Sequence, residues 1–238
     1  MKYSIACLLI FTLFSCKKEE KKELRIPKKE IQVNAENNED TLEVPDTLKI
    51  SYDEHKNLFD IITILPDSTF SSWEWPKSDR IEFVKKVKKN NYIATTSRFM
   101  WKFALIAPNT LQIQIVDGAW VLSIYKIKPN NYIVITDDIV GDGNDFHAFE
   151  YENGQLTNIP FRDLFDHFIT ALVIDPNDEK CMEIFDDNRI LFEYSYIGTK
   201  KIKMSNSYLD ENKDCFKGNT LNYEFNPLIK KFNLIKID

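Results

Sequence analysis

A run of alternating apolar and polar residues in the middle of this 238-residue chain constrains its fold more than any other feature. In Leu111–Ile115, three apolar residues alternate with two glutamines, which is the pattern of a strand with one buried face. Four further strand-like segments follow, at Trp120–Ile127, Tyr132–Ile139, Phe146–Tyr151 and Leu156–Ile159. Turn residues separate them, at Asp117-Gly118, Pro129-Asn130-Asn131, Gly141–Asp145 and Asn153-Gly154. Because the connections are so short, the sequence predicts an antiparallel meander.

Helical signals stand before and after this meander. Ser78 is a good N-cap residue, and the apolar residues behind it recur every third position, which predicts a helix ending at Asn90-Asn91. Ahead of this helix, Asp60–Leu65 has the apolar composition of a strand. After the meander, Phe161–Val173 predicts a second helix, because five of its apolar residues share one face.

Five more strands are predicted in the C-terminal part, at Met182–Phe185, Ile190–Ile197, Lys201–Asn206, Leu221–Phe225 and Phe232–Ile237. The order helix, meander, helix, meander predicts an α+β fold that is mostly antiparallel β. We assign residues 49–160 to the first half and residues 161–238 to the second. Two arrangements remain open: two separate halves, as from a duplicated unit, or one larger sheet with two helices.

The N-terminus changes its solvent preference abruptly. One lysine, Lys2, precedes the apolar run Ile5–Phe14, and seven consecutive charged residues occupy Lys17–Glu23. The run is ten residues long, whereas a helix needs about 20 residues to span a bilayer. This is the pattern of an export signal peptide rather than of a permanent membrane span or a core helix.

The junction Leu13-Phe14-Ser15-Cys16 resembles the lipobox of bacterial lipoproteins, with Phe14 departing from the small residue usual at its position. The resemblance implies that residues 1–15 are removed and that Cys16 carries a diacylglyceryl group and an acyl chain such as palmitate. Two or three chains on one cysteine give durable attachment, since each buried methylene contributes roughly 0.8 kcal/mol. In its signal, linker and β-rich body the chain resembles uncharacterised Bacteroidetes lipoproteins, so we expect an outer membrane lipoprotein anchored through Cys16.

Residues 16–48 are predicted to be a flexible linker, because their apolar residues are isolated among charged ones. Its first residues, Lys17-Lys18-Glu19-Glu20, resemble the Bacteroidetes lipoprotein export signal, which implies the cell surface rather than the periplasmic face. The alternative is that these residues are the start of a solvated tether and carry no sorting signal. Asp-Thr-Leu triplets around Thr41 and Thr47 resemble the acceptor motif of Bacteroidetes O-glycosylation.

Composition sets limits on the partners of the chain. Hydrophobic residues make up 43% of the sequence and aromatic residues 13%, which is enough for a real core. The formal net charge is −6, and no basic face is evident, so a nucleic-acid partner is not expected.

Two cysteines, Cys181 and Cys215, remain in the body after the signal is removed. Outside the cytoplasm such a pair is expected to form a disulfide. The alternative is a pair of free buried thiols. A zinc site is not expected, because no CxxC or HxxxH pattern accompanies them.

The sequence offers little catalytic chemistry. Its three histidines have no linking pattern, and no GxSxG, HExxH, P-loop or GxGxxG motif occurs. We therefore predict a protein that is not an enzyme, with no catalytic residues and no cofactor; a hydrolase with an unrecognised site remains an alternative.

Ligand binding has two candidate sites. The loop containing Asp142, Asn144 and Asp145 is rich in oxygen ligands but fails the EF-hand spacing, so we interpret it as a turn and expect no metal. Trp73 and Trp75 flank a Pro-ended loop, where they either stack on a ligand or pack in the core. The predicted function is a non-enzymatic binding module for an extracellular protein or glycan. The main alternative is an inhibitor or immunity-type protein that blocks a hydrolase or toxin.

Overall fold

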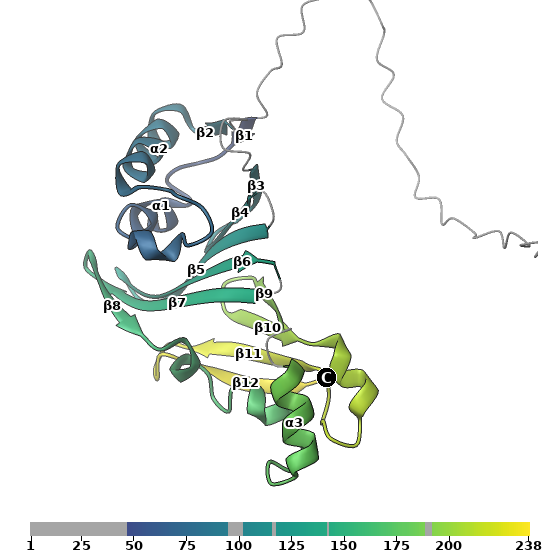
Figure 1. Ribbon diagram of the computed structural model, residues 1–238. Coiled ribbons are helices and arrows are strands. Elements are labelled where there is room, and N and C mark those ends of the chain that lie inside the picture. Colours follow the sequence, from purple (N-terminus) through teal and green to yellow (C-terminus); the bar gives the residue numbers. More distant parts are fainter. Residues whose placement is uncertain (1–46, 95–101, 116–117, 142, 189–191) are drawn as a thin grey trace, which may run out of the picture. The chain divides into compact units, whose positions relative to one another are not determined.

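The predicted meander forms a six-stranded antiparallel sheet in the computed structural model, which describes residues 47–94, 102–115, 118–141, 143–188 and 192–238 (Figure 1). The strand order follows the chain, β3-β4-β5-β6-β7-β8, so each strand pairs with its sequence neighbours. The strands are β3 (Lys102–Ala107), β4 (Thr110–Ile115), β5 (Gly118–Lys128), β6 (Asn131–Val140), β7 (Gly143–Glu152) and β8 (Gln155–Ile159). The predicted loop at Gly141–Asp145 is shorter than expected, because β7 already begins at Gly143.

The central strand β6 is buried on both faces. Tyr132 and Val134 belong to one hydrophobic cluster, and Ile133 and Ile135 to another. Since successive side chains of a strand point to opposite faces, the sheet separates two cores. Helices close one core and a second sheet closes the other.

The first core lies between the large sheet and three N-terminal helices, α1 (Lys56–Ile62), the short helix η1 (Asp67–Thr69) and α2 (Lys77–Asn90). Two short strands, β1 (Thr47–Lys49) and β2 (Tyr92–Ala94), flank these helices in the chain and pair with each other. α2 confirms the first predicted helix, and its C-cap Asn91 is left-handed with φ of 54°. The predicted N-cap Ser78 is wrong, because the helix begins at Lys77 with Pro76 as the N-cap, so Ser78 lies in its first turn. The strand predicted at Asp60–Leu65 is wrong, because these residues end α1 and form the turn behind it. Leu58, Phe59, Ile61 and Ile62 are all buried, which is the spacing of a helical face.

The second sheet has the order β12-β11-β10-β9, again antiparallel throughout. Its strands are β9 (Glu193–Ile197), β10 (Lys201–Ser205), β11 (Thr220–Asn226) and β12 (Lys231–Ile237), which confirms four of the five predicted strands. In the described residues the two meanders therefore form separate sheets rather than one large one, and the predicted α+β class with mostly antiparallel β is confirmed. Tyr125 of β5 contacts Phe232 of β12, with ring centroids 4.7 Å apart, so the two sheets share the second core.

Two predictions in the second half are wrong. The strand expected at Met182–Phe185 lies inside α3 (Glu179–Asn188), whose residues Cys181 and Phe185 are buried one helical turn apart. The helix expected over Phe161–Val173 is instead two short helices, η3 (Phe161–Leu164) and η4 (Ile169–Leu172). The break occurs where Phe165 bridges to Phe232 and where His167 has a φ of 56°.

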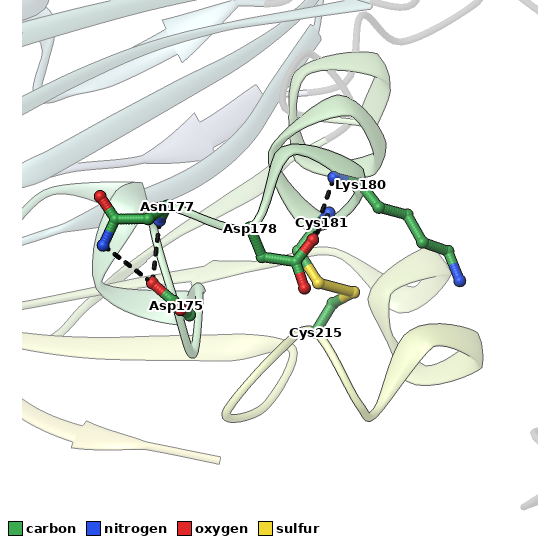
Figure 2. Close-up of a disulfide and its surroundings, with 6 residues drawn as sticks. All are labelled: Asp175, Asn177, Asp178, Lys180, Cys181 and Cys215. Carbon is green, nitrogen blue, oxygen red and sulfur yellow. Dashed lines mark hydrogen bonds between the residues drawn. A yellow bond between two sulfur atoms is a disulfide. The ribbon is translucent and has the colours of Figure 1, made fainter.

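The predicted disulfide between Cys181 and Cys215 is confirmed, with an S–S distance of 2.07 Å (Figure 2). It joins α3 to the segment behind the short helix η6 (Ser207–Asn212). Figure 2 also shows Asp178 at the start of α3, where its Oδ1 accepts hydrogen bonds from the backbone N–H groups of Lys180 and Cys181. The cap and the disulfide thus hold the same end of the helix.

The predicted signal peptide (1–15), Cys16, Thr41 and most of the predicted linker (16–48) lie outside the described residues. Thr47, the second glycosylation candidate, lies in β1 and pairs with Ala94.

Candidate functional site

Trp73 and Trp75 pack against other aromatic side chains. Their ring centroids lie 5.1 Å apart. Phe70 contacts both rings edge-on and stacks on Trp120 at 4.7 Å. Trp75 keeps only 7% of its surface exposed, whereas Trp73 is half-buried. Trp75 is thus a core residue, and the two tryptophans do not form an exposed stacking platform.

Arg80 is a buried cation that the sequence analysis did not identify. It lies on α2 with no exposed surface. Its Nη1 donates to Asp67 Oδ1 at 2.8 Å and to the carbonyl oxygen of Trp75, and its Nη2 donates to the carbonyl oxygen of Leu65 at 2.6 Å. The guanidinium carbon lies 4.6 Å from the centroid of the Phe70 ring. Arg80 therefore fastens α2 to the segment between α1 and α2, which is a structural role.

The structure does not bring the three residues of the predicted ligand loop together as one site. Asp142 lies outside the described residues, and Asn144 and Asp145 are part of β7. Asp145 Oδ2 accepts a hydrogen bond from Ser71 Oγ at 2.8 Å. Asp138, which pairs with Asp145 across the strands, accepts from the backbone N–H of Ser72 at 2.9 Å. These carboxylates fasten the segment behind η1 to the sheet.

The same polar cluster brings a hydroxyl, a carboxylate and an imidazole close together. His147 Nε2 lies 3.4 Å from Asp145 Oδ2, which in turn accepts from Ser71. The carboxylate stands between the other two groups, so the imidazole is not placed to take a proton from the hydroxyl as a catalytic triad requires. In the described part of the chain, no three His, Cys, Asp or Glu side chains are grouped so that they could hold a metal ion.

Asp137 points to the opposite face of β6 from Asp138 and is fully buried. Its Oδ1 accepts from Asn144 Nδ2 at 2.8 Å, and its Oδ2 accepts from the hydroxyl of Tyr196 at 2.8 Å. Burial raises the pKa of Asp137 to about 6, although both hydrogen bonds act in the other direction. Tyr196 belongs to β9, so this contact links the two sheets.

The described surface has depressions away from these carboxylates. One of about 210 Å³ lies beside Leu209, Lys213 and Phe216, and a more open one of about 420 Å³ lies beside Ile50 and Asn91. Neither is lined by Asp137, Asp138 or His147. The polar clusters described above therefore do not line either depression.

The turn between β11 and β12 presents two apolar side chains to solvent. Leu228 is 92% exposed and Ile229 is 54% exposed. We call Pro227–Lys230 the apolar tip. The two side chains are adjacent on one ordered turn, and exposed apolar groups that lie together can mark a protein interaction site.

Local contacts hold the apolar tip in one conformation. Asn226 Oδ1 accepts a hydrogen bond from the backbone N–H of Leu228 at 3.0 Å. Lys230 has a φ of 56°, and its Nζ pairs with Glu150 Oε1 of β7 at 2.6 Å. Pro227 fixes its own φ. The sequence carries one signal for this site, namely two apolar residues in the short connection between the predicted strands Leu221–Phe225 and Phe232–Ile237.

Within the described residues, no helix combines the length and the apolar content that crossing a bilayer requires.

Comparison with known proteins assigns the chain to no family. No protein-family model and no curated protein matches the chain. Among solved structures, the chain is similar to a domain of an uncharacterized protein from Porphyromonas gingivalis W83, with a TM-score of 0.48 and 9% sequence identity. The match covers 75% of this chain and 97% of that chain. A similarity of this extent carries no inference about activity or partners.

Proposed function

We propose that the chain is a lipid-anchored, surface-exposed lipoprotein whose body is a non-enzymatic binding module for an extracellular protein. The sequence around Cys16 supports the anchor. The observation that carries the binding function is the apolar tip, in which Leu228 is 92% exposed on an ordered turn.

The energetics of the apolar tip favour binding. Burying a leucine or isoleucine side chain in a partner contributes roughly 1.5–3 kcal/mol each. The hydrogen bond from Leu228 to Asn226 and the ion pair of Lys230 already order the turn. Because little conformational entropy is lost on docking, more of that contribution remains as affinity.

The charges around the apolar tip favour a protein over a bilayer or a glycan. Lys230 is paired with Glu150, and Lys128 is paired with Glu152 on the same strand, at 2.9 Å. These two lysines are paired within the body and contribute less to attraction of anionic lipid headgroups, while Lys231, directly after the tip, is exposed. Stacking on a glycan uses exposed aromatic faces, and the predicted candidate Trp75 offers none because it is buried. The partner we propose therefore has an apolar pocket that accepts Leu228.

An inhibitor or immunity-type role is the second candidate. A rigid turn that projects one apolar side chain can also fill the entrance of a hydrolase or toxin site. The apolar tip supports both roles equally, and the identity of the partner separates them.

Photo-crosslinking in cells that produce the full-length chain tests the binding function. A photoreactive phenylalanine analogue replaces Leu228 in one variant and Glu211 in another. Glu211 is an exposed residue of η6, at the opposite end of the second sheet, and serves as the matched control. We expect a discrete protein adduct at position 228 and none at position 211. With the partner purified, Leu228→Ala is expected to raise its Kd by about thirtyfold, because a central apolar anchor contributes about 2 kcal/mol.

Three results would contradict the proposal: no adduct at position 228, equal adducts at both positions, or an adduct to lipid alone. An adduct whose partner binds Leu228→Ala as tightly as the natural chain would also overturn it.

A further inference from the structure

Asp137 is a buried carboxyl group at the junction of the two sheets. It has no exposed surface, and it accepts one hydrogen bond from within its own sheet, from Asn144, and one from the second sheet, from Tyr196. Tyr196 lies on β9, which is an edge strand and, among the described strands, pairs with β10 alone. This hydrogen bond therefore attaches the free edge of the second sheet to the centre of the first.

The surroundings of Asp137 offer it no cation. Among the described residues, no lysine, arginine or histidine forms an ion pair with it. The nearby titratable groups are Asp138 on β6, Asp145 on β7, Tyr194 and Tyr196 on β9, and Tyr125 on β5, while Arg162 of η3 acts on Tyr194. The neighbouring ring of Phe146, which pairs with Asp137 across the strands, packs on Tyr194 with centroids 4.5 Å apart. An ionised carboxylate here is thus surrounded by carboxylates, phenols and aromatic rings.

We propose that Asp137, Asn144 and Tyr196 form a proton-linked clamp between the two sheets. When Asp137 is protonated, it fits its buried position without a net charge, and its O–H and C=O groups still satisfy Tyr196 and Asn144. When it is ionised, the uncompensated charge favours separation of β9 from β6 and entry of water. The clamp is independent of the apolar tip and of the lipid anchor.

The direction of the pH dependence follows from the raised pKa. An unfolded aspartate titrates near 3.9, and the buried one titrates at about 6. The native chain therefore binds more protons than the unfolded chain between these values, so stability falls as the pH rises through this window. This is the opposite of the usual behaviour of salt-bridged carboxylates.

Replacing Asp137 by asparagine tests the clamp, because asparagine keeps the shape and stays neutral at every pH. We measure the difference in Tm between Asp137→Asn and the natural chain at two pH values. We expect this difference to shift by about 5 °C in favour of the variant when the pH is raised from 4.5 to 7.5. In the natural chain, the amides of β9 are expected to exchange hydrogen about tenfold faster at pH 7.5 than at pH 4.5, after correction for the intrinsic rate. Glu82→Gln, at an exposed carboxylate on α2, is the control and should change neither quantity.

A carboxyl titration by NMR keeps the proposal testable if Asp137→Asn does not fold. A midpoint of Asp137 near 6 in the natural chain supports the clamp. A midpoint near 4, or equal pH dependence of Tm in the natural chain and in Asp137→Asn, would overturn it.

Discussion

Replacement of Arg80 by methionine is expected to lower the free energy of unfolding by about 3 kcal/mol. The guanidinium is fully buried and donates to the carbonyl oxygens of Leu65 and Trp75. Methionine has a similar volume but no donor, so both carbonyls lose the hydrogen bonds that Arg80 provides. Each unsatisfied buried carbonyl costs about 1–3 kcal/mol. Part of this combined cost is offset, because the variant no longer has to bury a charged guanidinium.

Urea denaturation measures this change, with Lys77→Met as the matched control. Lys77 is the first residue of the same helix and is exposed, so its replacement should change stability by less than about 0.5 kcal/mol. Arg80→Lys should fall between the two, because one ammonium group does not reproduce the planar fork that reaches two carbonyls. Equal stability of Arg80→Met and Lys77→Met would show that the buried arginine does not fasten α2.

Removal of the disulfide with the double variant Cys181→Ala/Cys215→Ala is expected to cost about 4 kcal/mol. The bond closes a loop between residues 34 positions apart, and its loss gives the unfolded chain more conformational freedom. Both cysteines are buried, so alanine leaves only a small cavity. The slope of free energy against denaturant should rise at the same time, because the uncrosslinked unfolded chain exposes more surface.

The natural chain treated with a reducing agent is the control for this variant and should approach its stability. Thiol titration of the untreated, natively expressed protein should find no reactive pair. Two titratable thiols in the folded body, or a variant as stable as the natural chain, would contradict the structural role of the bond.

The strands of the large sheet could be predicted because their signals are local. Alternation and short turns between Leu111 and Ile159 fix both the strand type and the antiparallel pairing. Taken alone, the run Asp60–Leu65 favours a strand rather than the end of α1. The helical spacing becomes visible only when Leu58 and Phe59 are included. The local pattern of Phe161–Val173 favours one helix. The structure has η3 and η4 instead, because Phe165 between them bridges to Phe232 of β12, a tertiary contact that overrides the local preference.

The buried polar groups were missed for a related reason. Arg80 lies on the same helical face as Val84 and Val87, but a charged residue at such a position is normally exposed. Asp137 lies within the predicted strand Tyr132–Ile139, and its burial became evident only once the second sheet was seen to cover that face. Conversely, Leu228 and Ile229 are apolar but exposed, and they belong to neither hydrophobic core. Which polar side chains are buried depends on how the sheets pack, and local patterns do not contain that information.

Mass spectrometry of the natively expressed protein tests the central claim, that the chain is a lipid-anchored module, most directly. We predict a mature N-terminus at Cys16 whose mass includes a diacylglyceryl group and an acyl chain, and loss of the protein from the membrane fraction in Cys16→Ala. An intact Met1, or a terminus at Cys16 with no added hydrocarbon, would contradict the account.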